Sequence, residues 1–438
     1  MTIKGKTIII LIVILLGSAI SYWYFLLRYS MNTIPINTDT EETGGFAPFG
    51  RTSSGGRQGT SGGENATTTN YSGQNEQVRL PVLRLLSDTP IGGYGASTTA
   101  STTVIRWIDR GRGNTYEARQ DSLNIRTLSN TILPRVYQSS WNKNLTAFIG
   151  TIFPDNSGDP SVVYAELQAH PIPKQQATTT ATSTPTAPAN NSMAPFDLKG
   201  KNLPEKTIAY AVSPKKDRLF VFVDENGSGT GYISNFNGSS LKKIFSSPLT
   251  QVNVDWPEEN TIAITTKGSS NQNGFLYFVN PNTGIIKKIL GPIRGLSTRV
   301  SHDARYVLYS TALISKNSIR AFIYSITSAS ETDALIQTLA DKCAWGHFYA
   351  YTVYCAAPSS LIQAEYPDDW YKGTVSFTDK IWAVDARTGE VSLVSALVDQ
   401  ADRLIDVFNM EISDKDEYLL FMNKKDLSFW SLDLVSSK

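Results

Sequence analysis

Aromatic rings and carboxylates are concentrated in one stretch of this sequence, Tyr366–Gly373. Aromatic faces stack on sugar rings and peptide groups, and neighbouring carboxylates accept hydrogen bonds from the same ligands. A structural alternative is that the rings fill space beside an adjacent element while the carboxylates cap a turn. We predict a site for a protein, peptide or glycan partner, formed by Tyr366, Asp368, Asp369, Trp370 and Tyr371.

The only two cysteines, Cys343 and Cys355, lie almost symmetrically about Tyr349. In a β-hairpin centred on that tyrosine they face each other across two strands, within the distance that a disulfide spans. Two buried free thiols are the alternative for a chain kept in a reducing compartment. Because the topology argued below places this part of the chain outside the cell, we predict a disulfide.

Residue types that serve catalysis form no linear motif here. The three histidines, His170, His302 and His347, fall in different repeats of the chain. The sequence lacks H-E-x-x-H, G-x-S-x-G and phosphate-loop patterns, so we predict no catalytic residue, metal site or cofactor. Carboxylates that several repeats bring to a central channel would leave no linear motif. An enzyme that acts on carbohydrate or peptide in such a channel is therefore the alternative class.

The elements that must position these residues are short β-strands. Aromatic residues make up 11% of the chain, and the apolar segments are rich in Val, Ile, Phe and Tyr. A strand, a polar turn and a strongly apolar strand recur, near residues 213, 255, 301 and 344, at spacings of 42, 46 and 43 residues. That period is typical of the four-stranded blades of a β-propeller, so we predict an all-β fold of this class.

Counting these units predicts seven blades, at residues 89–131, 132–206, 207–250, 251–295, 296–340, 341–400 and 401–438. The last blade has three visible strands, and a missing outer strand would leave an unpaired edge. Leu80–Leu86 carries the basic-apolar pattern with which later repeats end, although it precedes the first repeat. We therefore predict that this N-terminal strand completes the last blade.

Two insertions interrupt the predicted propeller, which spans residues 78–438. Residues 174–195 are rich in Thr, Ala and Pro, a composition typical of a disordered loop. Residues 357–380 contain the aromatic and acidic stretch described above and are predicted to be ordered.

Several motifs resemble those of known propellers. The Ser-Pro-x-x-Asp turn at Ser213–Asp217 resembles the repeats of TolB-like and WD-repeat-like β-propellers, although regular Gly-His and Trp-Asp pairs are missing. Arg106–Arg110, Tyr354–Pro358 and Tyr366–Gly373 resemble stretches of uncharacterised membrane-anchored propeller proteins of bacteria. The resemblance covers about residues 78–438 and implies the fold rather than an activity, because propellers host many unrelated functions.

The N-terminal residues 1–30 have a different composition from the rest. Ile8–Leu27 is mostly apolar and long enough to cross a hydrocarbon core of about 30 Å as a helix. Basic residues precede it and acidic residues follow it, which predicts a cytoplasmic N-terminal tip and an exported propeller. A signal peptide cleaved near residues 17–19 is the alternative. Residues 31–77, rich in Gly, Ser, Thr and Asn, are predicted to be a flexible tether.

The net charge of the chain argues against one class of partner, nucleic acid. The chain has 40 basic and 39 acidic residues and a net charge of +1, so no basic field attracts nucleic acid. We predict a single-pass, membrane-anchored binding or scaffold module whose propeller lies in the periplasm or at the cell surface. Its predicted contacts are the membrane, through Ile8–Leu27, and a protein, peptide or glycan of the cell envelope.

Overall fold

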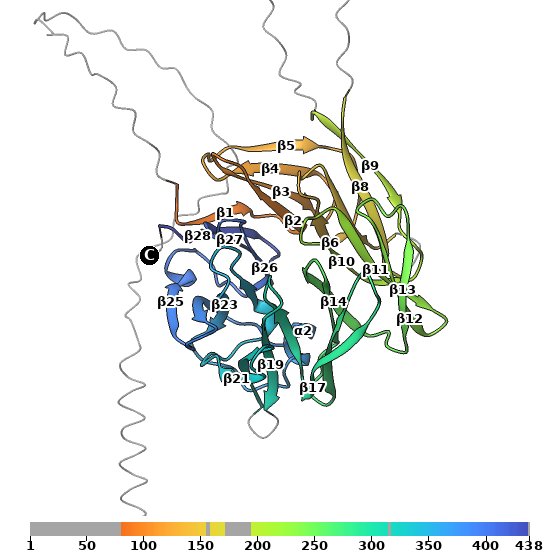
Figure 1. The fold of residues 1–438 in the computed structure, drawn as a ribbon. Coiled ribbons are helices and arrows are strands. Elements are labelled where there is room, and N and C mark those ends of the chain that lie inside the picture. The colour runs from red at the N-terminus through yellow and green to blue at the C-terminus, as the bar shows by residue number, and fades with distance from the viewer. Residues whose placement is uncertain (1–79, 155–157, 171–193, 314–316, 437–438) are drawn as a thin grey trace, which may run out of the picture. The chain divides into compact units, whose positions relative to one another are not determined.

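The computed structural model describes residues 80–154, 158–170, 194–313 and 317–436. The strands in these residues form seven four-stranded antiparallel sheets, which stand as blades around a common centre (Figure 1). The predicted all-β, seven-bladed propeller is therefore confirmed. Residues 174–193 of the predicted disordered insertion, the predicted tether and the predicted membrane span lie outside the described residues.

Six blades each use four consecutive strands. Blades one to three contain β2 (Ile91–Thr98), β3 (Thr103–Asp109), β4 (Thr115–Arg119), β5 (Ile125–Ser129); β6 (Val136–Trp141), β7 (Ala147–Ile152), β8 (Ser161–Ala169), β9 (Phe196–Asn202); and β10 (Thr207–Val212), β11 (Arg218–Glu225), β12 (Ser228–Asn235), β13 (Lys242–Ser247). Blades four to six contain β14 (Val252–Glu258), β15 (Thr261–Thr266), β16 (Asn273–Val279), β17 (Ile286–Arg294); β18 (Ser297–Val300), β19 (Tyr306–Leu313), β20 (Ser318–Ser325), β21 (Ser330–Asp333); and β22 (Cys343–Trp345), β23 (Thr352–Pro358), β24 (Asp379–Asp385), β25 (Val391–Ser395). Blade seven contains β26 (Val407–Ile412), β27 (Tyr418–Asn423), β28 (Phe429–Asp433) and β1 (Leu83–Ser87), and three short helices lie in connections: η2 (Ala340–Lys342), α2 (Asp368–Lys372) and η3 (Leu397–Asp399).

Strand β11 shows why a strand in the middle of a blade has a continuous run of apolar residues. Leu219 and Val221 pack toward blade two, whereas Phe220 and Phe222 pack toward blade four. Side chains of a strand alternate between the two faces of its sheet, and both faces of a blade are covered by neighbouring blades. The core therefore consists of successive layers between blades rather than one central cluster.

Strand β1 closes the ring as predicted. It pairs antiparallel with β28, with Leu83 opposite Leu432 and Leu85 opposite Trp430, so the last sheet has the order β1-β28-β27-β26. Leu83 packs in the layer between blades six and seven, and Leu86 packs in the layer between blades seven and one. The segment thus supplies the missing outer strand and side chains to both adjoining layers.

The predicted disulfide is confirmed. Cys343 and Cys355 lie opposite each other in β22 and β23, with their Cα atoms 4.1 Å apart, and their sulfurs are bonded. Blade seven holds the tip of this hairpin, because the buried carboxylate of Asp416 accepts hydrogen bonds from the backbone N–H groups of His347 and Tyr349 at 2.7 and 2.8 Å. The hairpin is therefore fixed at both its base and its tip.

Reduction of this disulfide is expected to lower the free energy of unfolding by about 2–3 kcal/mol, because the unfolded chain regains the freedom of a closed loop. The bonded residues are 12 positions apart in the sequence. Alkylation and mass measurement of the full-length protein, with and without prior reduction, tests the bond. Two alkylated thiols in the unreduced sample would contradict it.

No helix within residues 80–154, 158–170, 194–313 and 317–436 is long and apolar enough to cross a membrane. The segment for which a membrane span is predicted, Ile8–Leu27, precedes all of these residues.

Candidate functional site

The ordered insertion connects β23 to β24 and contains the five-residue helix α2. Its sequence explains this short helix: Asp368 and Asp369 in the first turn and Lys372 in the last complement the helix dipole. Gly373 ends the helix with φ 79°, a left-handed conformation that favours glycine.

The insertion reaches across two neighbouring blades. The Asp368 carboxylate accepts a hydrogen bond of 2.5 Å from the backbone N–H of Ser270, in the β15–β16 connection of blade four. The backbone N–H of Ala364 donates to the carbonyl of Asn317, in the β19–β20 connection of blade five, at 3.1 Å. Although partial burial opposes it, hydrogen bonding from Ser270 lowers the pKa of Asp368. The insertion is thus docked rather than free.

The predicted binding residues divide into two groups. Tyr366 and Trp370 are only 1% and 4% exposed and pack against Phe377. Asp369 accepts a hydrogen bond of 2.8 Å from the backbone N–H of Glu365, so it stabilises the turn before α2. The rings of Tyr366 and Trp370 thus fill space, and the carboxylates of Asp368 and Asp369 accept hydrogen bonds from the backbone. These are structural roles, as in the alternative to a binding site. Tyr371 is 41% exposed and is the one of the five whose ring faces open space.

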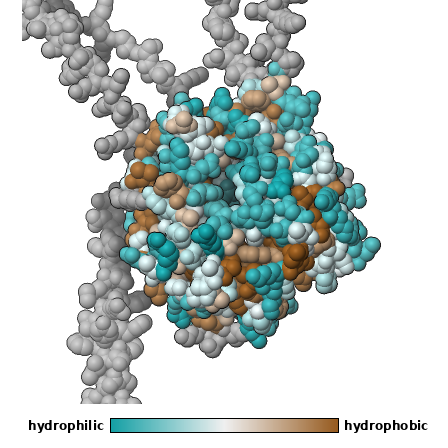
Figure 2. All heavy atoms as spheres, viewed as in Figure 1, coloured by the Kyte–Doolittle hydropathy of each residue, from teal (hydrophilic) through white to brown (hydrophobic). Residues whose placement is uncertain are grey.

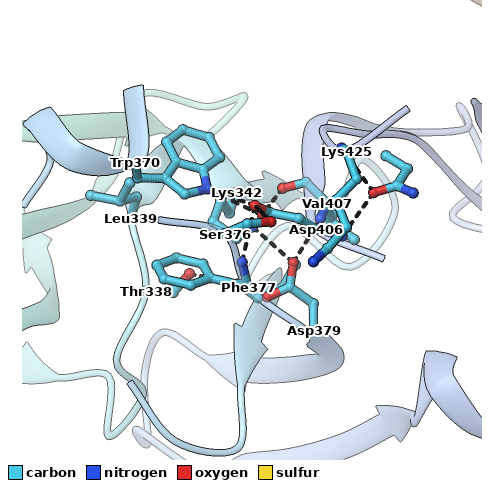
Figure 3. Close-up of polar contacts among 12 residues, drawn as sticks. Thr338, Leu339, Lys342, Trp370, Ser376, Phe377, Asp379, Asp406, Val407 and Lys425 are labelled. Atoms are coloured by element: carbon cyan, nitrogen blue, oxygen red, sulfur yellow. Dashed lines mark hydrogen bonds and ion pairs between the residues drawn. The ribbon is translucent and has the colours of Figure 1, made fainter. Parts of the chain in front are cut away.

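A buried ionic cluster, formed by Lys342, Asp379 and Asp406, lies between blades six and seven (Figure 3). The Lys342 side chain is 0% exposed, and its Nζ lies 2.8 Å from Asp379 Oδ2. The same ammonium donates to the Asp406 carboxylate, and to the carbonyl of Val407 at 2.7 Å. Each charge is therefore paired, as burial in a medium of low dielectric constant requires.

The ionic cluster also anchors the insertion. The Asp406 carboxylate accepts hydrogen bonds from the Trp370 indole at 3.1 Å, the Ser376 hydroxyl at 2.9 Å and the Phe377 backbone N–H at 3.1 Å (Figure 3). Lys342 Nζ lies 5.0 Å from the centre of the Trp370 ring, within cation–π range. A single carboxylate thus ties the insertion to blade seven.

Charge in this cluster is not balanced when both acids are ionised. Burial raises the pKa of Asp379 to about 6; the Lys342 ammonium lowers it, and the Asp406 carboxylate raises it. Asp379 Oδ1 is buried and has no hydrogen-bond partner among the described residues. Protonation of Asp379 leaves one cation and one anion, which is the better paired state.

Asp379→Asn is expected to make the protein more stable than wild type, by a larger margin at pH 8 than at pH 5, with the difference vanishing below about pH 3.8. The folded-state pKa of about 6 lies above the ordinary value of 3.8, so the contribution of Asp379 is complete below 3.8 and is lost as the pH rises through 6. Asparagine keeps an acceptor for Lys342 and does not titrate. Urea unfolding of both proteins from pH 5 to 8 measures the difference in their free energies of unfolding. Groups that titrate alike in the two proteins do not contribute to that difference. A difference that does not change with pH would contradict the prediction.

Asp341 and Tyr371, which adjoin Lys342 and Trp370 in the sequence, face the central channel. Asp341 precedes Lys342 in η2, and Tyr371 follows Trp370 in α2. The Tyr371 hydroxyl donates a hydrogen bond of 2.7 Å to Asp341 Oδ2. Both residues line a cavity of about 640 Å³ at one end of the channel, which we call the channel mouth. The buried ionic cluster therefore fixes the two short helices, η2 and α2, from which Asp341 and Tyr371 reach the rim of the channel mouth.

The channel mouth is lined mainly by hydroxyl, amide and aliphatic groups. The first strands of blades three, four and five contribute much of its wall. Its lining includes Thr207, Val252, Asn253, Val254, Thr265 and Thr298, and its charged groups are Asp255, Lys267, Arg299 and Asp341. Figure 2 shows one face of the molecule, on which hydrophilic residues dominate the middle and hydrophobic residues form patches. The cavity is of the size that ligand sites have.

Histidines from two blades meet in the fold, although they are far apart in the sequence. The rings of His302 and His347 stack with their centres 3.8 Å apart. Burial lowers the pKa of both, that of His347 to about 4, so both rings are neutral at pH 7. Within the described residues, no three His, Cys, Asp or Glu side chains are placed to hold a metal ion.

Four residues of this region were not predicted from the sequence as site residues: Lys342, Asp379, Asp406 and Arg299. Each of the three cluster residues stands immediately before or at the start of an apolar strand, β22, β24 or β26. A charge at that position was the available signal. It is a weak one, because a charge at the end of a strand is more often solvated.

Comparison with known proteins identifies the fold but not a family. No protein-family model matches the sequence, and no curated protein sequence matches it. Among solved structures, oligogalacturonate lyase from Vibrio parahaemolyticus superposes with a TM-score of 0.50 and 8% identity, over 81% of this chain and 92% of the lyase. The propeller domain of the trilobed protease from Pyrococcus furiosus gives 0.45 and 9%, over 77% and 96%. TolB from Acinetobacter baumannii gives 0.39 and 9%, over 64% of this chain and 59% of TolB. At 8% identity, the similarity to the lyase shows a shared fold alone.

Proposed function

We propose that the protein is a membrane-anchored, extracytoplasmic propeller that binds a protein or peptide partner at the channel mouth. The observation that carries the proposal is the placement of Tyr371, whose half-exposed ring is held at the rim by an insertion anchored on the buried ionic cluster. A rigid aromatic side chain beside a pocket is a typical anchor for a partner, since little side-chain entropy is lost on binding.

The chemistry of the channel wall supports binding over catalysis. Threonine hydroxyls, the Asn253 amide and aliphatic side chains suit the fixing of a polar ligand. The pKa values of both histidines are lowered, so the pair is neutral and poorly matched to acid–base catalysis near pH 7.

The membrane part of the proposal rests on sequence and on the disulfide. Ile8–Leu27 has the length and apolarity of a membrane anchor, and residues 31–77 have the composition of a tether. The bond between Cys343 and Cys355 is of a kind that persists in oxidising compartments, which supports a location outside the cytoplasm.

A photo-crosslinking amino acid in place of Tyr371, in the full-length protein in its native membrane, tests this function. Phe348 provides the matched control: it is exposed, aromatic and at the opposite end of β23 from the insertion. We expect a protein or peptide adduct at position 371, identified by mass spectrometry, and none at position 348. Equal adducts at both positions, or none at 371, would overturn the proposal. Cleavage of peptide or oligosaccharide that a Tyr371 variant abolishes would favour the enzyme alternative.

A further inference from the structure

Arg299 is a cation in the channel mouth whose guanidinium has no partner among the described residues. It belongs to the first strand of blade five, β18, and lines the cavity together with Tyr371. In the described part of the chain, its guanidinium makes no hydrogen bond and no ion pair within 4.0 Å, and its Nε is a buried donor without an acceptor. Buried donors are almost always satisfied in proteins, so the unsatisfied Nε of Arg299 requires an explanation.

The nearby carboxylates do not satisfy Arg299. Asp341 accepts a hydrogen bond from Tyr371, and Asp255 Oδ1 accepts one of 2.8 Å from the backbone N–H of Trp256. Glu411 is close enough to sense the charge of Arg299, but the two make no ion pair within 4.0 Å. The guanidinium is therefore available for a group that enters the channel from outside.

The backbone around Arg299 offers a second recognition element. Strands β10, β14 and β18 are each at the end of their sheet, so the edge of each that faces the channel has no strand paired with it. Consecutive residues of all three strands line the channel mouth, at positions 207–210, 252–255 and 298–300. The Arg299 carbonyl accepts a hydrogen bond of 3.0 Å from the Trp345 indole; the N–H and C=O groups that remain open on a strand edge match the alternating groups of an extended peptide. A sugar offers no such alternation.

We propose that the channel mouth binds an extended acidic peptide segment, with Arg299 pairing one of its carboxylates. This inference rests on the proposed function and names the chemistry of its ligand. The planar guanidinium presents its donors as a fork that fits a carboxylate with two parallel hydrogen bonds, which lysine cannot reproduce. The carboxylate comes from an Asp or Glu side chain or from a free C-terminus, both of which have the same planar geometry.

Fluorescence anisotropy with the full-length protein in detergent micelles tests the inference. The probes are labelled octapeptides of Gly and Ser with a central Asp-Asp pair, with Asn-Asn instead, or with Asn-Asn and a free C-terminus in place of the amide. Wild type is expected to bind the Asp-Asp or the free-C-terminus probe about tenfold to hundredfold more tightly than the amidated Asn-Asn probe, as a charge-assisted pair requires. Arg299→Gln is expected to abolish that preference, and Arg299→Lys to keep only part of it.

Arg305→Gln is the matched control, because Arg305 is an exposed arginine of the same blade. Thermal melting of all variants reports folding, and the comparison between probes on wild type does not depend on any variant. Equal binding of all three probes, or no binding of any while position 371 still forms adducts, would overturn the acidic-peptide inference and leave the proposed function intact. Arg299-dependent binding of a uronate-containing tetrasaccharide, without binding of the acidic peptides, would overturn the peptide class. Absence of adducts at 371 together with absence of probe binding would overturn both.

Discussion

Replacing Lys342 with methionine is expected to lower the free energy of unfolding by about 3–5 kcal/mol, because two carboxylates are then buried without their cation. The Lys342 ammonium contacts both Asp379 and Asp406. Methionine has a similar length and no charge, so the expected loss comes from electrostatics rather than from an empty volume. Urea unfolding of the full-length protein in micelles measures the effect.

Lys372→Met is the control for this substitution, because Lys372 ends α2 and its side chain is exposed. We expect its free energy of unfolding to stay within about 0.5 kcal/mol of wild type. The double variant Lys342→Met with Asp379→Asn removes one of the stranded charges and should recover part of the loss. Lys342→Met with wild-type stability would show that the cluster is not a structural anchor.

Loss of the ionic cluster should also disturb the channel mouth. Asp406 fixes Trp370, and the next residue, Tyr371, bonds Asp341 at the rim. Under conditions in which the Lys342→Met protein remains folded, crosslinking from position 371 is expected to fall. Unchanged crosslinking would mean that the insertion keeps its place without the cluster.

Deleting residues 78–87 is expected to open the propeller and to lower the free energy of unfolding by several kcal/mol. The deletion removes β1, which pairs with β28 along Leu83–Leu85 and carries Leu86 into the layer between blades seven and one. The last blade would then expose an unpaired strand and part of two apolar layers. Thermal melting of the full-length protein and of the deletion variant measures the loss.

A deletion of equal length at residues 60–69 is the control, since it shortens the chain before β1 without removing the strand. That variant should melt as wild type does. The β1 deletion should also aggregate more readily, because β28 becomes an open sheet edge. The same melting temperature in both deletions would show that the ring closes by other means.

The repeat pattern of the sequence was sufficient to predict the architecture. Blade period, strand alternation and the N-terminal closing strand each depend on residues that are near in sequence or repeat at a fixed interval, so the seven-bladed ring and the strand that closes it were predictable. The pairing of Cys343 with Cys355 was predictable for the same reason, since both belong to one hairpin.

The candidate site was predictable only in part. The stretch Tyr366–Gly373 was located, but composition does not tell which ring of an aromatic cluster is buried. Packing against Phe377 and the hydrogen bond to Asp406 put Trp370 inside, which leaves Tyr371 at the channel. The partner-binding role of the five residues remains a prediction, now centred on Tyr371.

Only the tertiary structure decided the position of the ionic cluster and of Arg299. Lys342 and Asp406 are 64 residues apart and meet because blades six and seven pack side by side. Arg299 lines a cavity to which the first strands of three blades contribute, and no side chain of the described residues pairs with its guanidinium. Such contacts depend on the mutual placement of whole blades. No periodicity within one repeat encodes that placement, so a lone charge in the sequence gave no indication of its partner.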